Sequence, residues 1–153
     1  MLNEGKDHEG YILSIAHFVG IADNIEPGSL SAASFWVGLR QEIYVAVIKK
    51  EVVRMPLVQS LIDSLGRLTD AADDFTWANR AVVHCAKVLN FCYDQTNDRP
   101  ASKWQELDTQ SKQWEQYCPA SYTEIYHQGA GPAFPEIWYH QSCHGRLARY
   151  LAA

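Results

Sequence analysis

The stretch from Ser34 to Lys50, SFWVGLRQEIYVAVIKK, constrains the fold more than any other part of the chain. Apolar residues recur in it at spacings of three and four, the period of an amphipathic helix. These residues are Phe35, Trp36, Leu39, Ile43, Ala46 and Val47. Two lysines close the stretch, where cations favour a helix C-terminus. A helix this apolar is unstable alone in water, so the rest of the chain is expected to cover it.

Composition places the chain among ordinary globular proteins. Its 153 residues are enough for one domain with its own core. A net charge of −5 provides no basic surface for nucleic acid, so direct DNA binding is not expected. Charged residues interrupt the apolar runs well before the roughly 18 residues that a membrane span needs. Residues 1–8 are polar, show no signal-peptide pattern and are expected to form a flexible N-terminus.

The cysteines point to an intracellular protein. Cys85, Cys92, Cys118 and Cys143 form no Cys-x-x-Cys pair, and the first two fall in one expected helix. This spacing favours reduced, buried thiols over a disulfide framework. Free cysteine commonly behaves as a small hydrophobic residue.

Periodicity predicts an all-α fold, an irregular bundle of five or six helices. No sustained β alternation occurs. The expected helical segments are 9–22, 34–50, 75–92, one that runs from its cap at Ser102 through Trp114 and ends at Pro119, and a last helix opened by Phe134-Pro135. The segment 57–68 is expected to form a helix or, equally, a loosely ordered connection with one or two helical turns. The expected signals between them are a turn at 25–28, an N-cap at Ser29, Ser31 or Ser34, an acidic start signal at 70–74, an N-cap at Ser102 and a stop at Pro119.

Four short blocks follow one another in an order that resembles a known family. They are FWVGLRQEIYVA at 35–46, Asn79 with LNFC at 89–92, W-x2-L-x6-W-x4-P-x-S-Y-x2-I at 104–125 and FPEIW at 134–138. Together they resemble the fungal-specific transcription factor domain, the helical regulatory region of fungal zinc binuclear cluster transcription factors. Glu124 stands where the family pattern has proline. The resemblance nominates these structural or regulatory residues: Trp36, Arg40, Glu42, Tyr44, Trp104, Trp114, Pro119, Phe134, Pro135 and Trp138.

The resemblance implies a regulatory module without catalysis or cofactor. It covers nearly the whole chain, so residues 9–153 are expected to form part of this longer helical domain. The implied location is the nucleus, and the implied partners are the rest of a transcription factor, co-regulators and a small-molecule effector. The six-cysteine zinc cluster that contacts DNA in the family has no counterpart here. A partial domain is also expected to expose apolar surface and to self-associate.

Arg40 is the sharpest polar feature of the central helix. An unpaired buried charge costs several kcal/mol, so Arg40 is expected to pair with Glu42 or with an acid from another helix. One interpretation is an anion site for an effector. The other, which we favour, is a structural ion pair.

An alternative hypothesis is a small α-helical ligand- or metal-binding protein or enzyme. His140 and His144 are four residues apart, so they share one face of a helix and could chelate a metal. A third ligand would have to come from elsewhere, for example His84 or His127. Arg40 would serve a ligand-binding version of the same hypothesis.

The absence of known catalytic motifs from the sequence argues against an enzyme. His84 and Cys85 are sequence neighbours, and neighbours on a helix diverge, so they cannot form a hydrogen-bonded dyad. The chain contains no Gly-x-Ser-x-Gly elbow, phosphate-binding glycine loop or dinucleotide fingerprint. Gly129-Ala-Gly131 is followed by proline, which is typical of a turn. The sequence therefore favours the non-catalytic interpretation.

Overall fold

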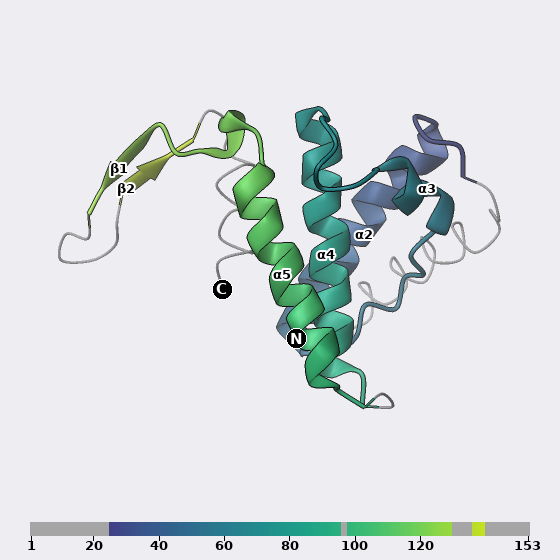
Figure 1. The fold of residues 1–153 in the computed structure, drawn as a ribbon. Helices are drawn as coiled ribbons and strands as arrows, with labels where there is room; N and C mark the ends of the chain where they lie inside the picture. The colour runs from purple at the N-terminus through teal and green to yellow at the C-terminus, as the bar shows by residue number, and fades with distance from the viewer. Residues whose placement is uncertain (1–24, 96–97, 130–135, 140–153) are drawn as a thin grey trace, which may run out of the picture. The chain divides into compact units, whose positions relative to one another are not determined.

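The computed structural model describes residues 25–95, 98–129 and 136–139 (Figure 1). These residues are mostly helical, which confirms the main point of the fold prediction. In chain order the elements are α2 (Leu30–Lys49), α3 (Gln59–Ser64), α4 (Asp74–Tyr93), α5 (Ala101–Tyr117), a 3-10 turn η1 (Ala120–Tyr122) and the strands β1 (Tyr126–Gln128) and β2 (Glu136–Trp138). The helix predicted at 9–22 lies outside the described residues.

The chain divides into two compact units, which are described separately. Unit 1 comprises Met1–Gly66 and Ala86–Arg99, and unit 2 comprises Arg67–Cys85 and Pro100–Ala153. Helices α2 and α3 therefore belong to unit 1, and α5 with the β-hairpin belongs to unit 2. Helix α4 supplies its first part to unit 2 and its last part to unit 1.

Helix α2 begins earlier than periodicity predicts because the turn before it and its N-cap are built together. The backbone N–H of Ser29 donates to the carbonyl of Glu26 at 3.2 Å, closing the predicted turn. Gly28 has a φ of +83°, which suits the third position of a type II turn. The Ser29 hydroxyl then accepts from the N–H of Ala32 at 3.1 Å and caps the helix. Ser29 was one of three serines predicted for this role.

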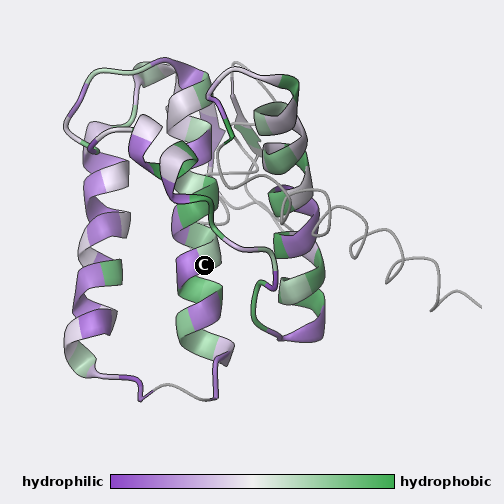
Figure 2. Cartoon of the chain, turned by 90° about the vertical axis from the view of Figure 1, so that its right-hand side faces the viewer, coloured by the Kyte–Doolittle hydropathy of each residue, from purple (hydrophilic) through white to green (hydrophobic). Residues whose placement is uncertain are grey.

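The inward side of α2 provides a larger share of the described core of unit 1 than any other element. Phe35 and Leu39 are fully buried, and the Phe35 ring meets the Trp36 ring edge-on with centroids 5.0 Å apart. The other buried apolar residues of this unit are Ile25, Ala32, Ile43, Ala46, Val53, Met55, Leu61, Leu65, Ala86 and Leu89. Figure 2 shows hydrophobic residues along the whole length of α2, whereas α5 is mainly hydrophilic. The predicted amphipathic helix is confirmed, but the expectation that the rest of the chain covers it is met on its inward side only, because Val37, Tyr44 and Ile48 are exposed.

Helix α3 covers only Gln59–Ser64 of the 57–68 segment, which agrees with the second expectation, a connection with one or two helical turns. It is preceded by Val58, whose side chain offers no cap, and it is followed within two residues by Gly66 at a φ of +64°. Leu61 is its one buried residue. With a single anchoring side chain and weak ends, the segment forms under two turns of helix and connects α2 to α4.

Unit 2 is built around three aromatic rings on α4, α5 and η1. Trp77 and Trp114 meet edge-on with centroids 6.2 Å apart, and Trp114 meets Tyr122 at 5.3 Å. Edge-to-face packing of this kind is a preferred aromatic geometry. The indole N–H of Trp114 donates to the carbonyl of Trp77 at 3.3 Å, so the buried polar tip is satisfied. Ala81 completes this core cluster.

The beginning of α4 is predicted correctly and that of α5 is not. The carboxylate of Asp73, in the acidic run, accepts from the N–H of Thr76 at 2.8 Å and caps α4. Helix α5 instead starts directly after Pro100, without a side-chain cap, and Ser102 lies inside the helix. The prediction of Ser102 as N-cap is wrong because Pro100, with a φ of −67° and a ψ of 140°, already turns the chain into the helix. The predicted stop before Pro119 is confirmed.

The residues after Pro135 form a strand, which corrects the prediction of a helix beginning there. Strand β2 pairs antiparallel with β1, with Tyr126 opposite Trp138 and His127 opposite Ile137. The Tyr126 and Trp138 rings lie 5.4 Å apart, and cross-strand aromatic pairs stabilise such ladders. Strand pairing and aromatic β propensity outweigh the helix-start signal of the preceding proline. The fold is thus mostly helical but not strictly all-α, and residues 140–153 lie outside the description.

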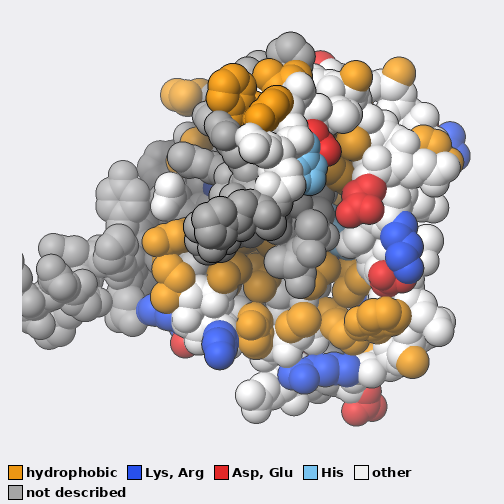
Figure 3. Space-filling view, turned by 90° about the vertical axis from the view of Figure 1, so that its left-hand side faces the viewer, with side chains coloured by type: hydrophobic (Ala, Val, Ile, Leu, Met, Phe, Trp, Pro, Cys, Tyr) orange, Lys and Arg blue, Asp and Glu red, His pale blue; other side chains and the backbone are white. Residues whose placement is uncertain are grey.

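The described surface carries apolar side chains as well as charges. On the face drawn in Figure 3, hydrophobic side chains reach the surface in several patches between charged ones. In the hairpin region the exposed ones are Ile125, Tyr126, Ile137 and Trp138. None of the helices in the described ranges combines the length and the apolarity of a membrane span.

Candidate functional site

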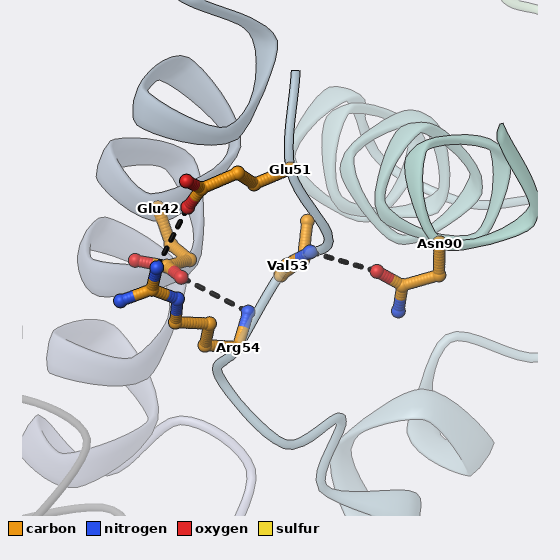
Figure 4. A network of polar contacts seen from close by, with 5 residues as sticks. All are labelled: Glu42, Glu51, Val53, Arg54 and Asn90. Atoms are coloured by element: carbon orange, nitrogen blue, oxygen red, sulfur yellow. Dashed lines mark hydrogen bonds and ion pairs between the residues drawn. The ribbon is translucent and has the colours of Figure 1, made fainter. Parts of the chain in front are cut away.

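A polar clamp in unit 1 holds the extended segment that follows α2 (Figure 4). Glu42, buried on α2, accepts from the backbone N–H of Arg54 through Oε1 at 2.9 Å. From the last part of α4, Asn90 accepts from the backbone N–H of Val53 through Oδ1 at 2.8 Å. Backbone donors that leave water need partners, and this segment belongs to neither a helix nor a sheet. The two side chains supply them, and we call these four residues the Glu42–Asn90 clamp.

Only one of the two carboxylate oxygens of Glu42 takes part in the clamp. Its second oxygen, Oε2, is buried and accepts no hydrogen bond from the described residues. The side chain of Arg54 turns to Glu51 instead, with Nη2 and Oε2 2.6 Å apart. Both partners of that pair are largely exposed, where an ion pair contributes little. The clamp is therefore an arrangement for accepting backbone hydrogen bonds, and a charge is not needed for that task.

Arg40 and Glu42 have different partners. Arg40 is half-buried, and its Nη1 donates to the carbonyl of Trp36 one turn earlier, at 2.9 Å. Residues two apart on a helix point to different sides, so Arg40 and Glu42 do not face each other. An ion pair with Arg40 is therefore not what holds Glu42. The expectation of an effector anion at Arg40 stays a prediction.

The residues nominated by the resemblance divide between core and surface. Trp36 and Trp114 are buried, in unit 1 and unit 2 respectively. Tyr44, Trp104 and Trp138 are exposed. Pro119 is half-buried just after α5, and Phe134 and Pro135 lie outside the described residues. Since Trp36 and Trp114 belong to different units, the set does not define a single described site.

Helix α4 buries several polar side chains within unit 2, and one of them, Arg80, is marked by no sequence pattern. Arg80 donates through Nη1 to the carbonyl of Asp70 at 3.2 Å, and its guanidinium lies 4.6 Å from the ring centroid of Trp77. Burial lowers the pKa of Arg80, and the charge of Asp70 opposes that change. The buried cation is thus placed against an aromatic face and a carbonyl. Asn79 and His84 are the other buried polar residues of this helix.

His84, a candidate third metal ligand, is engaged with α5. Its Nε2 lies 2.8 Å from the hydroxyl oxygen of Ser111. The neighbouring thiol of Cys85 is half-buried, and burial raises its pKa. A thiol with a raised pKa stays protonated near neutral pH and is a poor nucleophile. These two groups therefore act as packing and hydrogen-bonding groups of the helix.

The other histidines of the metal hypothesis are exposed or lie outside the described residues. His127, on β1, has Nδ1 3.6 Å from the carboxylate of Glu124, and both side chains are largely exposed. His140 and His144 lie outside the description. Within 25–95, 98–129 and 136–139, no three His, Cys, Asp or Glu side chains gather as metal ligands. The metal hypothesis thus still rests on the sequence.

The cysteines are partly as predicted. Cys85, Cys92 and Cys118 are free thiols, as expected. Cys92 is exposed, so the prediction that the thiols are buried is wrong for it: it lies on the solvent side of α4. Burial raises the pKa of Cys118, which is half-buried. Cys143 lies outside the described residues.

Two further contacts hold η1, the turn after α5, to the beginning of α4. The hydroxyls of Ser121 and Tyr122 donate to the side-chain and backbone oxygens of Asp74, each at 2.7 Å. Ser121 and Tyr122 are 47 and 48 residues away from Asp74 in sequence, so no local pattern predicts these contacts.

Asn90 of the Glu42–Asn90 clamp is weakly indicated by the sequence, because asparagine is unfavourable inside a helix unless its side-chain amide makes a hydrogen bond.

Comparison with family models, curated proteins and solved structures finds no match for this chain.

Proposed function

We propose that the chain is a non-catalytic regulatory module of a fungal transcription factor, without a DNA-binding zinc cluster of its own. It would be part of a larger helical domain with five or six helices in this portion. It would act in the nucleus through contacts with the rest of the factor or with co-regulators, and a small molecule could modulate it. The chain itself would not contact nucleic acid or membrane.

The observation that carries the proposal is that α2 is buried on one side and exposes apolar side chains on the other. The block FWVGLRQEIYVA, on which the resemblance mainly rests, lies wholly within this helix. Its Phe35, Trp36 and Ile43 are buried, while Val37 and Tyr44 face outward. A helix that is core on one side and apolar on the other suits a protein that works by binding other protein surfaces.

A reporter assay in a fungal cell tests this function. The full chain is inserted between an unrelated DNA-binding domain and an activation domain, and reporter output is compared with that of an unrelated helical insert. We expect the chain to change the output at least about threefold at equal protein level, which corresponds to a coupling of at least about 0.7 kcal/mol. The substitution Tyr44→Lys should remove the effect, while Tyr117→Lys, at an exposed position of α5, should keep it.

Two results would contradict the proposal. Output equal to that of the unrelated insert would remove the regulatory role. Stoichiometric metal in the purified chain, lost in a His144→Ala variant, would instead favour the metal-binding alternative. Elemental analysis decides the second point independently of the reporter.

A further inference from the structure

On the outward side of α2, the fully exposed positions before Lys49 include large apolar side chains and no charged ones, and the half-buried Arg40 is the one charge at the edge of this side. The large side chains Leu30, Val37, Tyr44 and Ile48 have 84%, 59%, 59% and 61% of their surface exposed. We call these four residues the outer stripe. All exposed positions of α2 before Lys49 are uncharged: Leu30, Ser31, Ala33, Ser34, Val37, Gln41, Tyr44, Val47 and Ile48. A solvent-facing helix side ordinarily carries charged residues, so this side has the composition of a contact surface.

The spacing of the outer stripe matches a second helix. Leu30, Val37 and Tyr44 follow one another at steps of seven residues, and Ile48 comes four later. Seven-residue steps keep side chains on one seam of a helix and are the spacing by which two helices pack along each other. The small residues Ala33 and Ser34 lie between them and permit close approach. Over 20 residues the helix is about 30 Å long, far longer than a small ligand.

We propose that the outer stripe is a homodimer interface in which the α2 helices of two copies lie antiparallel, with Val37 on the two-fold axis. Such an interface uses the same patch on both subunits and must be self-complementary. Leu30 lies seven residues before Val37, and Tyr44 lies seven after it. Leu30 of each copy therefore meets Tyr44 of the second copy, and Val37 meets its own equivalent.

The charges at the two ends of α2 favour this direction. Glu26, exposed in the turn before the helix, lies eleven residues before Val37. Lys49 and Lys50, also exposed, lie twelve and thirteen residues after it. An antiparallel pair brings Glu26 of each copy to the lysines of the second copy, whereas a parallel pair would gather all four lysines at one end. Antiparallel helix dipoles also attract each other. This inference does not depend on the regulatory function proposed above.

Analytical ultracentrifugation of the full chain tests the interface. An interface of one helix pair is below the roughly 1,600 Å² of a standard complex, so we expect a dissociation constant in the micromolar range and measurements from about 1 to 300 μM. Val37→Lys places two like charges on the axis and should raise the dissociation constant at least about 30-fold. The control Ile125→Lys makes the same kind of change at an exposed position of unit 2 and should leave it within about twofold.

A charge exchange tests the direction of the pair. Glu26→Lys alone, and Lys49→Glu with Lys50→Glu, should each raise the dissociation constant about 3- to 10-fold, and all three together should restore it. Circular dichroism checks the fold, and Tyr44→Lys replaces Val37→Lys if that variant unfolds. A monomer throughout the concentration range would overturn the proposal and leave the stripe to residues 1–24 or to another protein. A dimer insensitive to both stripe variants, or charge changes without restoration, would overturn it as well.

Discussion

Helices α2 and α5 have similar lengths but opposite surfaces. Helix α5 buries Leu107 and Trp114 and turns its remaining length to water. There it carries ion pairs along its own surface, Lys103 with Glu106 at 2.8 Å and Lys112 with Asp108 at 2.6 Å. Each such pair contributes only a few tenths of a kcal/mol but keeps the surface soluble. Helix α5 therefore needs a partner on one side only.

Helix α2 lacks a surface of this kind. It buries eight residues on its inward side, four times as many positions as the two of α5. On the other side it presents the uncharged outer stripe. A helix that is apolar all round is normally covered on all sides. The difference indicates that the exposed side of α5 is an ordinary solvent-facing surface, whereas the exposed side of α2 is an interaction surface.

The largest expected effect is a difference in stability between substitutions on the buried side and on the exposed side of α5. Trp114→Ala removes a ring packed between Trp77 and Tyr122 and should lower the free energy of unfolding by about 3–5 kcal/mol. Trp104→Ala, on the same helix but 57% exposed, should change it by at most about 0.5 kcal/mol. Urea denaturation with a shared slope measures both. Comparable losses in the two variants would contradict the one-sided description of α5.

The next effect concerns the inward side of α2. Glu42→Ala leaves the N–H of Arg54 without its acceptor and should cost about 1–3 kcal/mol. Glu42→Gln keeps an acceptor oxygen and removes a buried charge, so its cost should stay below about 1 kcal/mol. Chemical denaturation of the pair decides whether the clamp needs an acceptor or a charge. If Gln cost as much as Ala, the carboxylate charge itself would be required.

A smaller loss of stability is expected from the contact between η1, the turn after α5, and the beginning of α4. Tyr122→Phe removes the hydroxyl that donates to the carbonyl of Asp74 and should cost about 1 kcal/mol. Tyr117→Phe, at an exposed position of α5, is the matched control and should be neutral within about 0.5 kcal/mol. Thermal and urea unfolding give both values. A neutral Tyr122→Phe would mean that the ring alone holds this junction.

The smallest effect extends the comparison to helix ends and to pH. Helix α2 is capped by the neutral hydroxyl of Ser29, whereas α4 is capped by the carboxylate of Asp73. Hydrogen bonds from Thr76 lower the pKa of Asp73. A folded-state pKa below the unfolded one gives stability that is present above the unfolded pKa and is lost as the pH falls through the folded one.

We therefore expect Asp73→Asn to lower the melting temperature near neutral pH by a small amount that disappears in acid. The same change at Asp98, exposed and outside the helices, serves as control. Melting curves from pH 7 to pH 2 for both variants measure the difference. A gap that stays constant with pH would show that the charge of Asp73 does not contribute to the cap.

Much of the helical fold follows from local sequence. Helices α2 and α4 are long and periodic, and their caps at Ser29 and Asp73 are residue types that cap helices. The wrong predictions concern elements whose start or type is determined by another segment of backbone, either adjacent or distant in sequence. Pro100 starts α5 in place of the better cap residue Ser102, and β2 forms because β1 is available to pair with it.

The candidate site is less predictable, because its partners are backbone atoms and remote residues. Glu42 is expected only as an ion-pair partner of Arg40, whereas its donor is the backbone N–H of Arg54, which no side-chain pattern marks. Asn90 reaches Val53 across 37 residues. Periodicity also groups Val47 with the core, although it is exposed, because spacing alone cannot tell which apolar side of α2 is covered.

Hydroxyl-radical footprinting of the full chain with mass spectrometry tests the contrast between α2 and α5 most directly. Tyr44 of α2 and Tyr117 of α5 are both exposed within one chain, so each serves as reference for the other. If the outward side of α2 is a contact surface, Tyr44 oxidation should slow with rising protein concentration while Tyr117 oxidation stays constant. Val37→Lys should abolish that slowing. Equal, concentration-independent oxidation of both tyrosines would contradict the account.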